Sequence, residues 1–143
     1  MRLAAAMLLA LLAGSVSRAQ TPSPTPPPEC PRADETSQRH LLGLWHAEFE
    51  GSPRGATLLL EPHPDQRESV RGEVNRDGER SALSGELDDG DFTLEESRNG
   101  VNISAVWLGE VVEGSCGREI RGAWKAEGAR QQLQFVLRKL GTP

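Results

Sequence analysis

A single glutamate, Glu96, is the residue best placed for chemistry in this sequence of 143 residues. It shares the parity of Leu94 within an alternating stretch, and alternation by two places both side chains on one face of a β-strand. A carboxylate on an apolar face needs a partner or a raised pKa. We expect Glu96 either to reach water at the rim of the fold or to anchor the polar part of a ligand.

Large or polar side chains of the same parity would gather around this carboxylate. They predict a ligand-binding site whose candidate contacts are Phe49, Ser81, Glu96, Trp107 and Trp124. Glycines and alanines of inward parity would leave space for a ligand, whereas the three tryptophans and three phenylalanines, all inward, would fill that space. The pattern favours a largely filled interior and leaves a hollow one open.

Catalytic and metal chemistry find little support in the sequence. No second group is visible that could work with Glu96 as an acid or base, and no nucleophile motif or glycine-rich phosphate loop is present. The histidines are too scattered for a recognisable metal site. They are His40, His46 and His63. The sequence therefore predicts a protein that is not an enzyme and that carries no cofactor and no metal.

Alternation with a period of two dominates from His40 onward, and no convincing helical stripe interrupts it. It predicts eight strands. These are Leu41–Glu50, Ala56–Glu61, Val70–Arg76, Glu79–Asp88, Asp91–Ser97, Val101–Glu113, Arg118–Glu127 and Arg130–Leu140.

The turns between the last six of these strands fix the register, because a hairpin loop of known length determines which residues face each other. The turns are Asp77-Gly78, Asp89-Gly90, Asn99-Gly100, the four-residue loop Gly114–Gly117, and Gly128-Ala129. The Asn99-Gly100 turn, for example, would place Glu96 opposite Ile103. A slip of one residue at any turn would send an apolar set to the wrong face.

Eight hairpin-linked strands with one apolar face most simply close into an eight-stranded antiparallel up-and-down β-barrel. Closure pairs the last strand with the first and removes both sheet edges. Inward glycines let the strands coil as a small barrel requires. They are Gly43, Gly72, Gly85, Gly109 and Gly122. A two-sheet β-sandwich is the alternative.

Residues 1–19 have the features of a secretory signal peptide. Arg2 precedes the apolar run "LAAAMLLALLAG", and small residues stand at Ser17 and Ala19 before the expected cleavage position. Residues 20–39 are rich in proline and predict an extended linker. The β-barrel domain would then occupy residues 40–143, in a periplasmic or secreted protein.

The charge of the mature chain argues against a nucleic-acid partner, and the length of its apolar runs argues against a membrane span. The formal charge of −5 becomes −7 when Arg2 and Arg18 are removed with the leader. A domain this acidic is a poor nucleic-acid binder. The leader's apolar run is too short to span a bilayer and no later run replaces it, so the sequence predicts no membrane span.

Cys30 and Cys116 are the two cysteines of the chain. A lone pair in an exported protein usually forms a disulfide. Counting strands places the turn with Cys116 and the start of the first strand at the same end of the barrel. We expect a bridge that pins the Pro-rich segment across that end, with two free thiols as the alternative.

The segment "LLGLWHAEFEG" begins the first strand with a Gly-x-Trp motif, Gly43-Leu44-Trp45. Lipocalins, avidins and bacterial periplasmic inhibitors of secreted metalloproteases begin their barrels similarly, so this resemblance implies a barrel. With "GDFTLEES", "AVWLGEVVEGSCG" and "IRGAW", the domain also resembles a family of small secreted proteins of Gram-negative bacteria that has no assigned function. Avidins use a tyrosine and a late aspartate for their ligand. This chain has no tyrosine and no aspartate after Asp91, so the resemblance does not extend to biotin binding.

Together these features predict an exported, non-catalytic binding module for a small apolar or amphipathic ligand. The alternative is a protein-interaction or inhibitor scaffold that acts on a periplasmic or secreted partner. In that hypothesis the Pro-rich arm, or outward apolar residues such as Leu44 and Leu108, would meet the partner.

Overall fold

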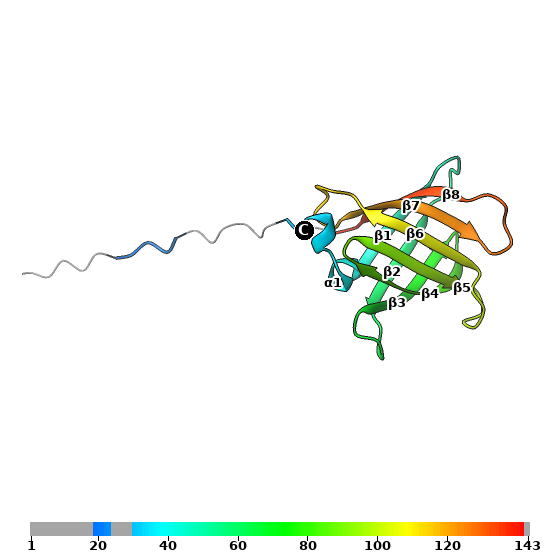
Figure 1. Ribbon diagram of the computed structural model, residues 1–143, viewed down its shortest axis with the longest axis horizontal. Coiled ribbons are helices and arrows are strands. Elements are labelled where there is room, and N and C mark those ends of the chain that lie inside the picture. The colour runs from blue at the N-terminus through cyan, green and yellow to red at the C-terminus, as the bar shows by residue number, and fades with distance from the viewer. Residues whose placement is uncertain (1–18, 24–29, 142–143) are drawn as a thin grey trace, which may run out of the picture.

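The protein forms a closed barrel of eight antiparallel strands that follow one another in chain order (Figure 1). A computed structural model describes residues 19–23 and 30–141. The strands are β1 (Gly43–Phe49), β2 (Ala56–Pro62), β3 (Ser69–Arg76), β4 (Glu79–Asp88), β5 (Asp91–Ser97), β6 (Ala105–Val111), β7 (Glu119–Ala126) and β8 (Leu133–Lys139). β1 pairs with β8, which confirms the predicted up-and-down barrel and rules out the sandwich.

Two regions predicted from the sequence fall wholly or partly outside the described residues. The predicted signal peptide, residues 1–19, lies outside them except for Ala19. Residues 24–29 of the predicted Pro-rich linker also lie outside the described residues. Among the described residues, no helix has the length and apolar character needed to cross a membrane.

The register confirms four of the five predicted turns. Val74 faces Ser81 across the Asp77-Gly78 turn, as predicted. The turns at Asp89-Gly90, Gly114–Gly117 and Gly128-Ala129 likewise give the predicted partners. Because the register is the predicted one, every second residue of these strands points into the barrel, and these inward residues are mostly apolar.

The strand pairing predicted across the Asn99-Gly100 turn is wrong by two residues in register. Glu96 faces Ala105 and not Ile103, because residues 98–104 form a longer loop. Asn99 holds this loop by accepting the backbone N–H groups of Val101 and Asn102 on its Oδ1, at 2.9 and 2.8 Å. A shift of two preserves parity, so the strand after the loop still points its apolar side inward. Val101, which the sequence predicted to begin the next strand, instead lies in the loop and is 83% exposed.

Apolar side chains fill the barrel, as the aromatic count favoured. Trp45, Phe92, Trp107 and Phe135 are all buried, and the Trp107 and Phe135 rings lie 5.0 Å apart in an edge-on arrangement. Inward glycines allow this packing. A Cβ atom added to Gly122 would collide with the backbone carbonyl of the neighbouring strand, and the same holds at three of the other predicted positions, Gly72, Gly85 and Gly109.

A short helical segment closes one end of the barrel, which we call the closed end. It comprises the 3-10 helix η1 (Ala33–Glu35) and the helix α1 (Gln38–Leu41), where the sequence predicted an extended linker (Figure 1). Thr36 and Leu41 are buried beneath the strands. Local hydrogen bonds, such as Thr36 Oγ1 to the carbonyl of Ala33 at 2.6 Å, explain why this polar stretch turns back on itself.

Two side chains of the barrel lock this segment in place. The indole of Trp45 donates to the carbonyl of Leu41 at 2.7 Å, and the ammonium of Lys139 donates to the carbonyl of His40 at 2.8 Å. The Lys139 ammonium also lies 5.6 Å from the centre of the Trp45 ring, within range of a cation–π contact. The Gly-x-Trp motif therefore has a structural role at the closed end.

The disulfide between Cys30 and Cys116 is present and ties the start of this segment to the β6–β7 loop. Both residues lie at the closed end, as the strand count predicted. The bridge closes 86 residues of chain, for which loop entropy gives a stabilisation of about 3–5 kcal/mol.

Replacing both cysteines with serine (Cys30→Ser, Cys116→Ser) tests this role. We expect the far-ultraviolet circular dichroism spectrum to stay that of a β-barrel, because the sheet closes without the bridge. The melting temperature should fall by about 12–20 °C, because the loop-closure stabilisation is lost. A variant that melts at the wild-type temperature would contradict a stabilising role.

Candidate ligand-binding site

At the opposite end of the barrel, which we call the open end, none of the described residues forms a cover of this kind. Four connections surround it: residues 50–55, the turn at residues 77–78, the loop at residues 98–104 and the loop at residues 127–132 (Figure 1). Since antiparallel neighbours alternate in direction, every second connection must lie at this end. The inward residues nearest to it therefore decide what the barrel can bind.

An ion pair between Arg76 and Glu96 occupies the interior just below the open end. Arg76 is the last residue of β3, and Glu96 lies in β5. The two Nη atoms of Arg76 donate to the two carboxylate oxygens of Glu96 at 2.6 and 2.8 Å. The Glu96 side chain is only 2% exposed, whereas that of Arg76 is 27% exposed. The expectation that Glu96 reaches water at the rim is therefore wrong.

Two tryptophans complete the surroundings of this carboxylate. The indole N–H groups of Trp107 and Trp124 each donate to Glu96 Oε2 at 3.2 Å. With the two bonds from Arg76, four donors engage a group that offers about four acceptor positions. Glu96 is consequently a structural anchor whose hydrogen-bonding capacity is used within the protein.

The pKa of Glu96 reflects two opposing effects. Burial is the largest single effect and would raise the pKa, because it penalises the charged form. The hydrogen bonds and positive charge of Arg76, followed by the two indole donors, together outweigh burial and hold the pKa below its ordinary value. Glu96 is therefore ionised at neutral pH and unsuited to act as a general acid there.

Aromatic rings surround the guanidinium group of Arg76. Its central carbon lies 5.1 Å from the ring centre of Trp124, 5.6 Å from that of Trp107 and 5.8 Å from that of Phe49. Cation–π contacts of this kind stabilise a partly desolvated cation by roughly 1–2 kcal/mol. The ion pair and its rings thus fill the upper interior.

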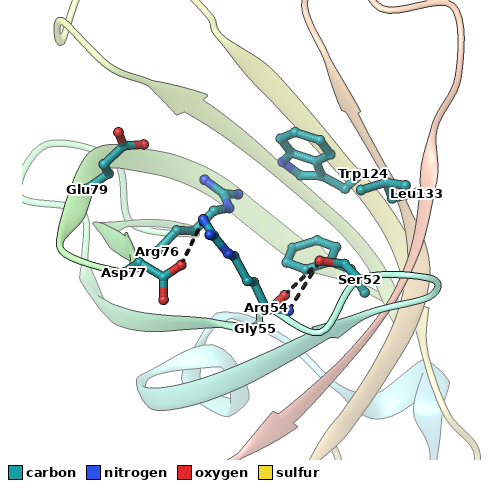
Figure 2. A pocket seen from close by; sticks show the side chains of 9 residues that line it. Ser52, Arg54, Gly55, Arg76, Asp77, Glu79, Trp124 and Leu133 are labelled. Atoms are coloured by element: carbon teal, nitrogen blue, oxygen red, sulfur yellow. Dashed lines mark hydrogen bonds and ion pairs between the residues drawn. The ribbon is translucent and has the colours of Figure 1, made fainter.

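Above this layer lies a pocket of about 400 Å³ at the open end. Phe49, Trp124 and Leu133 form its apolar wall, and Arg76 contributes to it from β3. Arg54 reaches the same pocket from the β1–β2 connection (Figure 2). The remaining lining residues are Ser52, Gly55, Asp77 and Glu79.

Arg54 forms an ion pair with Asp77, which lies in the turn between β3 and β4. Its guanidinium lies 3.3 Å from Asp77 Oδ2, a contact drawn in Figure 2. Both side chains are well exposed, so this ion pair contributes little stability. The pair therefore adds one exposed positive and one exposed negative group to the rim of the pocket.

The structure separates the five predicted ligand contacts into two groups. Phe49 and Trp124 line the pocket. Ser81, Glu96 and Trp107 are buried and do not line the pocket, whereas Arg76, which packs in the same part of the interior, does line it. Two of the five predicted contacts therefore line a pocket at the open end, and the other three belong to the packed interior below it.

Seven of the nine residues that line the pocket were not predicted as ligand contacts, and three of these seven are its two arginines and its leucine. Arg76 could have been found, since it shares the inward parity of Val70 and Val74 in the same strand. Leu133 also has inward parity, at the start of β8. Arg54 gives no such signal, because it lies in a connection without alternation. Among the described residues, no group of three or more His, Cys, Asp or Glu residues is placed to hold a metal ion.

Replacing Glu96 with glutamine tests the buried ion pair. The change leaves the Arg76 charge without its counter-ion, so we expect a loss of about 3 kcal/mol in the free energy of unfolding at neutral pH. Because the folded-state pKa of Glu96 is lowered, the pair's stabilisation is complete above the ordinary glutamate pKa and is lost as pH falls through the lowered value.

The difference between wild type and this variant should therefore shrink as the pH of urea unfolding is lowered from 7 toward 3. Glu95→Gln is the matched control, since Glu95 is the adjacent residue and its side chain is exposed on the opposite face. A difference that stays constant with pH would argue against an ionised Glu96.

Comparison with protein-family models and with curated proteins finds no match for this chain.

Proposed function

We propose that this barrel is a non-catalytic binding protein that holds a small amphipathic ligand in the pocket at its open end. The observation that carries the proposal is the pocket itself. Its volume of about 400 Å³ falls within the range of roughly 300–1,000 Å³ that is usual for small-molecule sites. Apolar walls with a few convergent polar groups are also usual there.

The filled interior supports a ligand position at the mouth of the barrel. Trp107, Phe92 and the Arg76–Glu96 pair occupy the space where a hollow barrel would hold its ligand. Phe49 and Trp124 present the upper edge of this packed layer to the pocket. A ligand would therefore rest on a preformed aromatic floor, which lowers the entropic cost of binding.

Export is part of the proposal. A disulfide ties the described chain together, and disulfides persist in oxidising compartments such as the periplasm or the medium. The bridge lies at the closed end, away from the pocket. Its role would be to keep the fold intact in an oxidising compartment.

An uncharged fluorescent probe tests the site without presuming the charge of its ligand. N-phenyl-1-naphthylamine brightens when it enters an apolar site. We expect it to bind, and Leu133→Ser to weaken its binding by about tenfold, because the change removes one apolar wall of the pocket.

Leu108→Ser is the matched control, since Leu108 is an exposed leucine on the outer face of β6. It should leave the affinity unchanged. An equal loss in both variants, or no loss in Leu133→Ser, would contradict binding in the pocket.

A second candidate function, a protein-binding scaffold, is favoured by the loop at residues 98–104. Hydrogen bonds to Asn99 hold this loop, while Val101 and Ile103 are exposed on it. An ordered loop with exposed apolar side chains is typical of a protein contact.

If this loop binds a protein, the double change Val101→Ser with Ile103→Ser should abolish capture of that partner from an envelope extract of the source organism. Leu44→Ser with Leu59→Ser, which alters a neighbouring exposed pair on β1 and β2, should leave capture intact. Capture that is indifferent to the loop would remove this candidate.

A further inference from the structure

The guanidinium of Arg76 has hydrogen-bonding capacity that the protein does not use. It carries five N–H donors, and Glu96 takes one from each Nη atom. No described residue accepts from the Nε–H group. Within the described part of the chain, no fully buried side-chain nitrogen or oxygen lacks a hydrogen-bond partner. The Nε atom of Arg76 therefore reaches solvent, and Arg76 lines the pocket.

This free donor lies in a setting that strengthens charge-assisted hydrogen bonds. The Arg76 side chain is largely buried and surrounded by Phe49, Trp107 and Trp124. Low local polarity makes a bond from an ionised donor stronger than the same bond in water. Glu96 holds the guanidinium rigidly, so an acceptor would meet it with little loss of side-chain entropy.

A second guanidinium, that of Arg54, reaches the same pocket (Figure 2). Its only described ion-pair partner is Asp77, in an exposed and therefore weak contact. An incoming anion could replace Asp77 at little cost.

We infer that the pocket binds a monocarboxylate with a compact apolar body. The carboxylate accepts from Arg76 Nε–H and from Arg54, and the apolar body packs against Phe49, Trp124 and Leu133. The inference rests on the proposed function and specifies the class of ligand.

The charges around the pocket favour this class over two others. A doubly charged head such as a phosphate would need more positive charge than two arginines that Glu96 and Asp77 already partly neutralise. A cationic head would have only Asp77 and Glu79 to meet it, and both carboxylates are exposed at the rim, where water screens them. Among the charged side chains in the described lining of the pocket, Arg76 alone is partly buried, and its free Nε–H group is a donor.

The experiment compares three probes that share one ring system: 2-naphthoate, 2-naphthamide and 2-naphthylmethylammonium. Calorimetry at neutral pH should show 2-naphthoate binding at least about tenfold more tightly than either of the others, because only its carboxylate gains charge-assisted bonds. Equal affinities for the carboxylate and the amide, or tighter binding of the ammonium, would overturn the inference.

Variants at the rim give effects of opposite sign. Arg54→Gln should weaken 2-naphthoate binding by about fivefold and leave 2-naphthamide unchanged. Asp77→Asn should strengthen 2-naphthoate binding by about threefold, because it removes the competing carboxylate. Asp77 has a positive φ of 52°, a conformation that asparagine tolerates, so the turn is preserved. Arg80→Gln, which alters an exposed arginine outside the pocket, is the control for net charge.

Arg76 is examined without mutation, because its loss would leave Glu96 buried and unpaired. In nitrogen-15 NMR spectra, the Arg76 Nε–H signal should move on addition of 2-naphthoate and stay in place with 2-naphthamide. A signal that ignores 2-naphthoate would overturn the assigned contact. If all three probes bind with equal affinity and Leu133→Ser still lowers that affinity, the pocket is supported and the carboxylate preference is contradicted. If no probe responds to Leu133→Ser, the proposed function falls as well.

Discussion

The buried ion pair between Arg76 and Glu96 is the interaction on which the open half of this barrel depends. A carboxylate that is 2% exposed would be strongly destabilising without partners. Four donors satisfy it, and two of these are indole groups whose rings are thereby oriented. The same rings then enclose the guanidinium. One charged residue thus organises both the packing of the upper interior and the floor of the pocket.

The two ends of the barrel are built on different principles. At the closed end, the disulfide, the Trp45 indole and the Lys139 ammonium hold a helical segment over the strands. In the part of the chain that the structure describes, no segment covers the open end, and the side chains of its rim residues Arg54 and Asp77 share one exposed ion pair. The covalent bridge and the helical cover therefore lie at the end away from the pocket. This division lets the open end keep a solvent-accessible donor that no described residue uses, together with an aromatic surface, without endangering the fold.

Most of the barrel could be predicted from the sequence because alternation and turn length constrain each other. The exception was the loop after β5, where Asn99 bonds to its own loop backbone and lengthens the connection by two residues. The helical segment at residues 33–41 was missed because its helices are too short to show a periodic stripe. The inward position of Glu96 could be predicted from parity, but its partner was not predicted, since Arg76 is 20 residues away in sequence and stands directly before a turn.

The most direct test of this account is the position of a bound ligand. A crystal structure with 2-naphthoate should show the carboxylate beside Arg76 Nε and the rings against Trp124, with the Arg76–Glu96 pair undisturbed below. A ligand found beneath Arg76, with the ion pair broken, would show that the ion pair opens to admit the ligand and does not support it from below. A ligand bound only at the outer surface of the strands would contradict the account entirely.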